Sequence, residues 1–136
     1  MTRPEIEALF AERGIRLTPQ RFALMDYMVH NYEHATADQI YEAVNRTDPN
    51  GSKATVYNNL RALVDAGLIR EVPLEGRAAR FDTNLHKHHH FICDRCGELE
   101  DVDWFDVPKP SGLGSRSVRV CEVILRGLCT KCSKKH

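Results

Sequence analysis

The chain has 136 residues, with 19 Lys and Arg against 19 Asp and Glu, so its formal net charge is zero with neutral histidines. This length fits one domain or two small ones, and the balanced charge gives no general indication of nucleic-acid binding. No apolar run approaches membrane-spanning length, and the charged N-terminus is unlike a secretory signal. We therefore expect a cytoplasmic protein without a membrane partner, whose cysteines serve metal or redox chemistry.

The first part of the chain has the pattern of short amphipathic helices. Apolar side chains at helical spacing predict a first helix over residues 4–13. Thr-Pro at 18–19 is a helix start and predicts a second helix that reaches residue 29. The sequence T-A-D-Q at 36–39 is a capping box, which predicts a third helix that ends near residue 45.

A fourth helix is predicted after the turn sequence D-P-N-G at 48–51, with Ser52 as its N-cap and Gly67 just past its end. A β-hairpin around Gly76 follows. Helices followed by a hairpin are the order of a winged helix-turn-helix, in which the fourth helix would enter the major groove. The polar face of that helix presents Lys53, Tyr57, Asn58 and Arg61.

The alternative is a small helical domain whose polar face is only solvated. Residues 1–83 carry ten Lys and Arg against twelve Asp and Glu, so this half of the chain is slightly acidic. Any contact with DNA must therefore come from a local basic surface.

The second half of the chain changes in character. Residues 88–93 predict a strand, residues 98–102 a strand that returns antiparallel, and residues 106–115 a loop. A further strand is predicted over 118–126, and Cys121 within it is expected to be a buried, inert thiol. This small α/β or all-β unit cannot bury a large core, so a bound metal should contribute to its folding.

Two C-x-x-C pairs predict a structural zinc site. Cys93 and Cys96 form the first pair, and Cys129 and Cys132 form the second. Four thiolates fill a tetrahedral zinc ion and leave no position open for a substrate. The alternative is a redox dithiol or a disulfide switch, but a thioredoxin-like C-x-x-C would occur once and open a helix.

The histidine-rich strand predicts a second metal site. His88 and His90 project to the same side of a strand and can converge on one ion, whereas His89 points to the other side. Asp101 on the return strand could approach the same face. The alternative is a solvated strand with adventitious affinity for metals.

Two further ligands are possible but distant in the sequence, namely His34 and Asp82, and spacing alone does not select them. A set of imidazoles and carboxylates contains only nitrogen and oxygen donors, which suit Fe²⁺ or Mn²⁺.

Six segments of the chain resemble the ferric uptake regulator (Fur) family, in the order in which that family has them. They are R-L-T-P-Q-R (16–21), H-A-T-A-D-Q-I-Y (34–41), A-T-V-Y-N-N-L (54–60), R-F-D (80–82), H-H-H-F-I-C-D-R-C-G (88–97) and G-L-C-T-K-C (127–132). The resemblance implies a metal-dependent transcriptional repressor that is a homodimer and not an enzyme. It implies an α+β fold with a winged helix-turn-helix DNA-binding domain over 1–82, a hinge over 83–87 and a small α/β metal-binding dimerisation domain over 88–136.

The resemblance also implies roles for individual residues. The four cysteines match the family's structural zinc ligands, at Cys93, Cys96, Cys129 and Cys132. The regulatory Fe²⁺ or Mn²⁺ ligands of the family match His34, Asp82, His88, His90 and Asp101. Arg16, Tyr57 and Asn58 fall where the family contacts DNA, and a two-fold dimer should bind double-stranded DNA with a pseudo-palindromic operator.

Within the family, the chain is most similar to the peroxide-responsive branch, PerR. Iron-responsive members usually have Glu in place of Asp82 and Asp101, and Arg in place of Asn58. In the peroxide branch, Fe²⁺ reacts with hydrogen peroxide and oxidises a ligand histidine, here His34 or His88, so that metal and DNA are released.

Two alternatives are an iron- or zinc-level sensor of the same architecture and, in a different class, a redox or metalloenzyme built on the histidine strand. The segment 103–116 departs from the family pattern, because it is shorter and lacks the expected helix.

Overall fold

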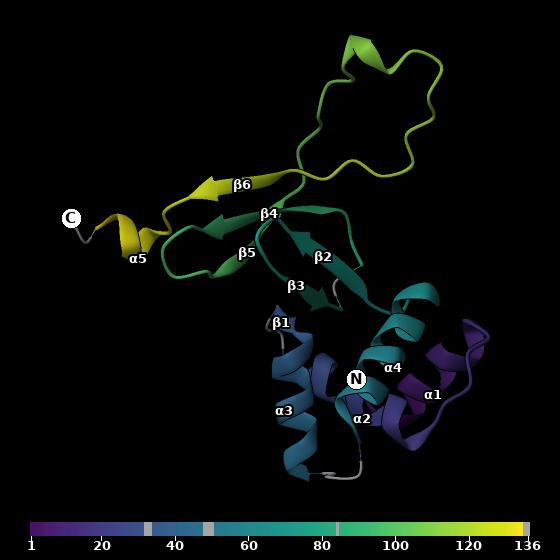
Figure 1. Ribbon diagram of the computed structural model, residues 1–136. Helices are drawn as coiled ribbons and strands as arrows, with labels where there is room; N and C mark the ends of the chain where they lie inside the picture. The colour runs from purple at the N-terminus through teal and green to yellow at the C-terminus, as the bar shows by residue number, and fades with distance from the viewer. Residues whose placement is uncertain (32–33, 48–50, 84, 135–136) are drawn as a thin grey trace. The chain divides into compact units, whose positions relative to one another are not determined.

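The computed structural model describes residues 1–31, 34–47, 51–83 and 85–134, which divide into two units, Met1–Leu85 and His86–His136 (Figure 1). Within this described part, no helix has the length and apolar character that crossing a membrane would need. Residues 48–50 of the predicted turn and residue 84 of the predicted hinge lie outside the described residues.

The described residues of the first unit form four helices, which follow the predictions closely. They are α1 (Arg3–Glu12), α2 (Pro19–His30), α3 (Ala37–Thr47) and α4 (Lys53–Asp65). Each begins at a side chain that accepts a hydrogen bond from the first helical turn. The capping oxygens belong to Thr2, Thr18, Thr36 and Ser52. Local capping therefore sets where these helices start.

Helix α4 ends where the sequence predicts. Gly67 has a φ of +75°, a left-handed conformation that residues with a Cβ rarely adopt. The next backbone N–H, that of Leu68, donates to the Leu63 carbonyl at 3.0 Å and satisfies an orphan acceptor of the last turn. This ending turns the chain from α4 into the first strand of the hairpin.

The apolar faces of the helices form one core in the first unit. Its most enclosed members have relative exposures of 2% or less, namely Ile6, Phe10, Leu24, Met25, Ile40, Leu60, Leu63, Leu68 and Ile69. This core holds α4 with its opposite, polar face exposed to solvent.

The hairpin of the first unit is β2 (Arg70–Leu74) and β3 (Arg77–Asp82), paired antiparallel. A two-residue strand that the sequence did not predict, β1 (Ala35–Thr36), joins the other side of β3. Its register pairs Ala35 with Phe81. The residue before β1 and the residue after Phe81 are thereby brought to the same end of the sheet.

The second unit is a three-stranded sheet in the order β5-β4-β6, formed by β4 (His88–Cys93), β5 (Leu99–Asp103) and β6 (Ile124–Gly127). β5 runs antiparallel to β4, as predicted, and β6 runs parallel to it. A short helix, α5 (Thr130–Ser133), follows β6 (Figure 1). The chain thus has the α+β class that the sequence predicts.

The prediction of a strand over 118–126 is wrong for its first six residues. The ladder with β4 begins at Ile124, and the N–H of Val123 before it donates to the His89 ring. Cys121 is therefore outside the sheet, and it is exposed rather than buried.

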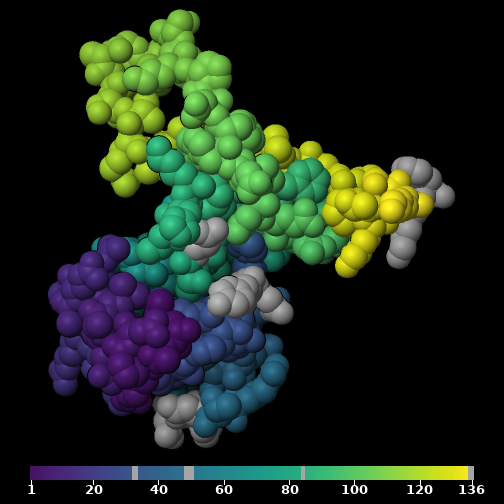
Figure 2. All heavy atoms as spheres, turned by 180° about the vertical axis from the view of Figure 1, so that it is seen from behind, coloured from purple at the N-terminus to yellow at the C-terminus, as the bar shows by residue number. Residues whose placement is uncertain are grey.

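The segment between β5 and β6 contains only one 3-10 turn, η1 (Ser111–Leu113), and none of its described residues forms an α-helix. In Figure 2 it is the light-green open loop. Several large apolar side chains of this segment and of β6 are exposed: Trp104, Phe105, Val107, Val118, Val120 and Leu125. We refer to these six side chains as the apolar group of the second unit.

Candidate metal centres and nucleic-acid interface

The first candidate metal centre is a cluster of four thiols in the second unit. The Sγ atoms of the two C-x-x-C pairs all lie within 4.8 Å of one another, those of Cys93, Cys96, Cys129 and Cys132. The first pair lies where β4 turns toward β5, and the second lies at the start of α5. All five cysteines belong to the described residues, and none forms a disulfide.

The distances in this cluster fit a tetrahedral ion. Two ligands at the usual Zn–S distance of about 2.3 Å are about 3.8 Å apart at a tetrahedral angle. The Cys96 and Cys129 Sγ atoms lie 3.8 Å apart, well beyond disulfide bonding distance. The four cysteines that the sequence predicts as zinc ligands therefore form a site with the size and donor set that zinc requires.

The thiols of this cluster cannot all ionise easily without a cation. Backbone N–H groups, first that of Cys96 and then that of Cys129, lower the pKa of Cys93 to about 6. The hydrogen bond with Cys129, followed by burial, raises the pKa of Cys132 to about 12. Neighbouring sulfurs thus share protons, and a divalent cation is the species that would convert all four to thiolates.

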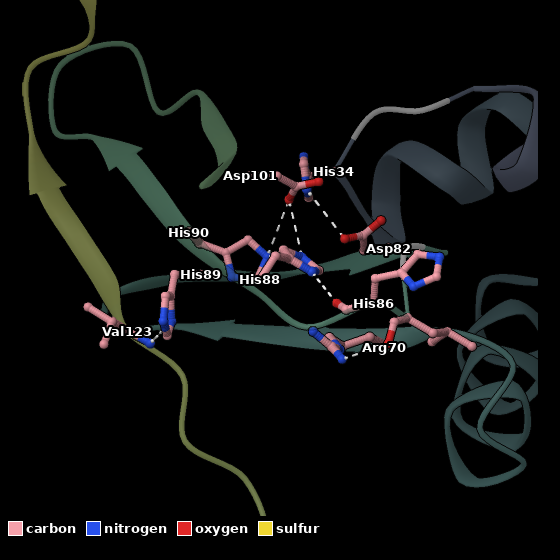
Figure 3. A network of polar contacts seen from close by, with 10 residues as sticks. His34, Arg70, Asp82, His86, His88, His89, His90, Asp101 and Val123 are labelled. Carbon is pink, nitrogen blue, oxygen red and sulfur yellow. Dashed lines mark hydrogen bonds and ion pairs between the residues drawn. The ribbon is translucent and has the colours of Figure 1, made fainter. Parts of the chain in front are cut away.

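The histidine strand β4 carries three buried imidazoles, at positions 88, 89 and 90. The Nε2 atoms of His88 and His90 lie 3.0 Å apart. An Asp101 carboxylate oxygen on β5 lies 3.3 Å from His88 Nε2 and 3.6 Å from His90 Nε2 (Figure 3). The strand register pairs His90 directly with Asp101. Two imidazole nitrogens and one carboxylate therefore point at a common position.

His88 is held in orientation from its other side, because its Nδ1 lies 2.6 Å from the His86 carbonyl oxygen. The carbonyl can only accept a hydrogen bond, so Nδ1 carries the hydrogen and Nε2 has the lone pair in the neutral ring. A backbone acceptor behind a ligating imidazole is the usual arrangement in protein metal sites.

His89 belongs to the opposite face, as the sequence predicts, and has a structural environment. Its Nδ1 accepts the Val123 N–H at 3.0 Å, and its Nε2 lies 2.8 Å from the Phe105 carbonyl oxygen. Its ring stacks on Trp104 with centroids 4.3 Å apart. Both ring nitrogens are thus used to join β4 to the segments that flank the open loop.

In the first unit, β1 brings together the two candidate ligands that spacing could not select. His34 Nε2 and a carboxylate oxygen of Asp82 lie 3.5 Å apart, and both side chains are largely buried (Figure 3). Arg80 donates to the His34 carbonyl at 3.1 Å, which fixes the backbone at this position. Spacing in the sequence gives no hint of this pairing, which depends on the tertiary pairing of β1 with β3.

The candidate DNA-binding residues of α4 are exposed, as expected for a recognition helix. They are Lys53, Tyr57, Asn58 and Arg61. Arg16 lies in the exposed segment before α2. Arg21 connects the segment of Arg16 with α4, because its guanidinium donates to the Arg16 carbonyl at 2.8 Å and to the Asn59 side chain at 3.1 Å.

Two carboxylates that the sequence did not single out contact this face. Tyr57 donates its hydroxyl to Asp38 at 2.7 Å, and Arg61 lies 3.3 Å from Glu71. These partners are 19 and 10 residues away along the chain, so no spacing pattern could have identified them.

Comparison with known proteins agrees with this architecture. A profile of the "Ferric uptake regulator family" matches residues 12–115. The peroxide-responsive repressor PerR of Staphylococcus epidermidis (strain ATCC 12228 / FDA PCI 1200) is 36% identical over 132 residues, which cover 94% of this chain and 88% of that protein.

Two solved structures are also similar. The first is PerR from Streptococcus pyogenes, reported as a structural basis for peroxide sensing and gene regulation. It is 28% identical with a TM-score of 0.53, and the match covers 94% of this chain and 90% of that one. The second is the ferric uptake regulator of Helicobacter pylori, with a TM-score of 0.72, coverage of 96% and 90%, and 17% identity, which shows the fold alone.

A winged helix-turn-helix unit together with a small sheet unit that carries candidate metal ligands is the architecture of a metal-responsive transcriptional regulator. The chain belongs to the ferric uptake regulator family. Members of this family regulate transcription and are not enzymes.

Proposed function

We propose that this protein is a metal-dependent DNA-binding repressor that senses hydrogen peroxide through Fe²⁺-dependent oxidation of a ligand histidine. The observation that carries the proposal is the convergence of His88 Nε2, His90 Nε2 and the Asp101 carboxylate on one position. A solvated surface strand would not need three nitrogen and oxygen donors oriented toward one position. Such donors suit Fe²⁺ or Mn²⁺.

The regulatory ion would be held by ligands from both units. The second unit supplies His88, His90 and Asp101, and the first supplies the pair His34 and Asp82. A single ion that binds all five favours the arrangement of the units in which its ligands meet. The change in DNA affinity then equals the differential affinity of the ion for that arrangement, ordinarily about 1–3 kcal/mol per site. The hinge at residues 83–87, between domains 1–82 and 88–136, would absorb the movement.

The peroxide-sensing part of the proposal rests on the carboxylates and on the relatives. Asp82 and Asp101 are the shorter acids found in the peroxide branch that the sequence resembles, and the S. epidermidis relative is named a peroxide-responsive repressor. Bound Fe²⁺ would activate the peroxide, and the imidazole would supply the two electrons that reduce it. One peroxide oxygen would replace a hydrogen on a ring carbon, and the other would leave as water. The product on the protein would be an oxygenated imidazole at His34 or His88, which is a weaker ligand. Each chain would react once, so the process is not turnover.

Binding to DNA is proposed for the exposed face of α4 together with Arg16. Lys53, Tyr57, Asn58 and Arg61 lie where a recognition helix meets base edges and phosphates. The apolar group on the loop and on β6 supports a homodimer through the second unit, because its exposure would be unfavourable in a monomer. A two-fold dimer would bind a pseudo-palindromic operator.

Zinc at the four cysteines is proposed to be structural. It would close a unit in which three of those cysteines form a buried cluster with Phe91 packed against it. Such a site needs reduced thiols, and we therefore place the protein in the cytoplasm.

The experiment that tests the function is a titration of an operator duplex with the zinc-loaded protein, with and without Mn²⁺. The operator is first selected from a random duplex library with the Mn²⁺-loaded wild type. We expect Mn²⁺ to strengthen binding in the wild type and in the control His30→Ala, which removes an exposed histidine of α2. His90→Ala should not respond to Mn²⁺. A response of His90→Ala equal to that of the wild type would refute the proposal.

An iron- or zinc-level sensor of the same architecture is the second candidate. It predicts a metal response without oxidation of any histidine by peroxide. The peroxide experiment below separates the two.

A further inference from the structure

Two carboxylates of its own unit contact the polar face of α4. Asp38, in the first turn of α3, accepts the Tyr57 hydroxyl at 2.7 Å. The same carboxylate oxygen lies 3.5 Å from Lys53 Nζ. One acid therefore contacts both a cationic and a hydroxyl group of the proposed DNA-binding face.

A second acid contacts the cationic side chain that lies further along α4. Glu71, on β2, places its two carboxylate oxygens 3.5 and 3.3 Å from one nitrogen of the Arg61 guanidinium. The Arg61 side chain is 57% exposed, whereas the Glu71 side chain is only 29% exposed. The acid thus comes from beneath the arginine, out of a cavity between α3, α4 and the hairpin that Phe81 also lines.

The contacts of Asp38 and Tyr57 determine whether each side chain is ionised. The Tyr57 hydrogen bond, followed by the charge of Lys53, lowers the pKa of Asp38, so this acid is ionised at neutral pH. The same hydrogen bond raises the pKa of Tyr57, which therefore remains a neutral hydroxyl. Both cationic side chains of this face that reach toward DNA, Lys53 and Arg61, have an acid within ion-pair distance.

Exposed ion pairs contribute little to the stability of a fold. Their effect on a DNA ligand is larger, because a phosphate must either displace the carboxylate from its partner or approach beside a like charge. Phosphate contacts supply the sequence-independent part of DNA affinity, whereas contacts with base edges supply specificity. Carboxylates that contact the cationic groups of the α4 face therefore weaken the sequence-independent affinity for phosphates. They leave the specificity from base contacts unchanged.

We infer that Asp38 and Glu71 are specificity-determining residues, which occupy Lys53, Tyr57 and Arg61 in the free protein and thereby suppress binding to arbitrary DNA. The inference rests on the proposed function of α4. Any DNA must replace the carboxylates as partners of these side chains with its own phosphates. Operator DNA also forms base contacts, which compensate for this replacement, whereas arbitrary DNA does not. The slightly acidic composition of residues 1–83 acts in the same direction.

The test compares full-length, Mn²⁺- and zinc-loaded proteins on two probes. One is a random-sequence duplex of about 30 base pairs, long enough for two half-sites one helical turn apart. The other is an operator of the same length selected from a random library with the wild type. The variants are Asp38→Asn and Glu71→Gln, which keep size and remove charge. The control is Glu12→Gln, an exposed acid of α1 that forms no ion pair within the described chain.

Each carboxylate variant frees one cation for a phosphate. We expect binding to the random duplex to become roughly fivefold tighter near 0.15 M salt, with a salt slope steeper by about 0.9. Operator binding should change less, so the ratio of the two affinities should fall. Glu12→Gln should leave both affinities and both slopes as in the wild type, and far-UV circular dichroism checks that all variants are folded.

Two results would overturn the inference while leaving the proposed function in place. The first is unchanged affinity and slope on the random duplex for both variants, with wild-type operator binding intact. The second is weakened operator binding with an unchanged random duplex, which would make the acids orienting groups for base contacts. A wild type that binds neither duplex would refute the proposed function itself, and the inference with it.

Discussion

His88 and His90 lie on the same face of β4 with their Nε2 atoms 3.0 Å apart, and the Asp101 carboxylate faces both from the adjacent strand. This relationship follows from the two-residue period of a strand and from a register that pairs His90 with Asp101. These three side chains lie on one face of the sheet and could hold an ion there (Figure 3). The four thiols, of which Cys93 ends the same strand, could hold a second ion.

Loss of one thiol should unfold the second unit. Cys96→Ser removes a zinc ligand from a unit that has little other buried apolar surface, so we expect zinc below one ion per chain and a lower melting temperature. The matched control is Cys121→Ser, because Cys121 is exposed and outside the cluster. Zinc analysis measures the ion content of each variant, and differential scanning calorimetry measures its melting temperature. Equal zinc and equal melting in the two variants would show that the thiols are not a structural zinc site.

Peroxide should oxidise a histidine in the Fe²⁺-loaded protein. We expect an increase of about 16 Da, one oxygen atom, on a peptide that contains His34 or His88. Cleavage after Arg21 and Arg46 gives a peptide with His34 that also holds Met25 and Met28, so fragmentation must locate the oxygen. The Mn²⁺-loaded protein is the control and should stay unmodified. Oxygen found only on cysteines would contradict the proposed sensing chemistry.

A charge on the exposed edge strand should weaken the dimer. Leu125 on β6 is 42% exposed and belongs to the apolar group of the second unit. Leu125→Glu places a charge in the proposed interface, and we expect a shift toward monomer in sedimentation velocity. Ala11→Glu adds the same charge on the exposed side of α1 and should leave the distribution unchanged. A dimer that tolerates both changes would mean that the interface lies elsewhere.

The N-cap of α4 should contribute measurably to stability. Ser52 accepts the Thr55 N–H at 3.1 Å, and its replacement by alanine should lower the free energy of unfolding by about 1 kcal/mol. Urea denaturation followed by circular dichroism measures this difference. Ser117→Ala, at an exposed position outside any helix or strand, is the control and should have no effect. An equal result for the two variants would mean that the cap adds nothing.

The parts of the fold that local chemistry decides could be predicted from the sequence. Helix starts at Thr18 and Ser52, the end of α4 at Gly67 and the alternation of His88 with His90 all depend on neighbours within a few residues. Features that depend on a distant partner could not be predicted. The two-residue strand β1 forms only because β3 is beside it, and it is β1 that places His34 against Asp82.

The same reason explains the error over residues 118–126. The composition of this segment favours a strand, but its pairing with β4 is a tertiary contact that begins only at Ile124, after the Val123 N–H has donated to the His89 ring. Cys121 is therefore exposed. The contacts of Asp38 and Glu71 with α4 could not be predicted for a similar reason, since only tertiary packing brings these acids to the helix.

The central claim is that one exchangeable ion takes ligands from both units. Metal analysis after dialysis of the Mn²⁺-loaded protein tests it most directly, with one variant in each unit, Asp82→Ala and His88→Ala, and His30→Ala as control. We predict one zinc ion per chain throughout, one manganese ion per chain in the wild type and the control, and loss of that manganese in both variants alike. Full manganese retention in either Asp82→Ala or His88→Ala would contradict a site shared between the units.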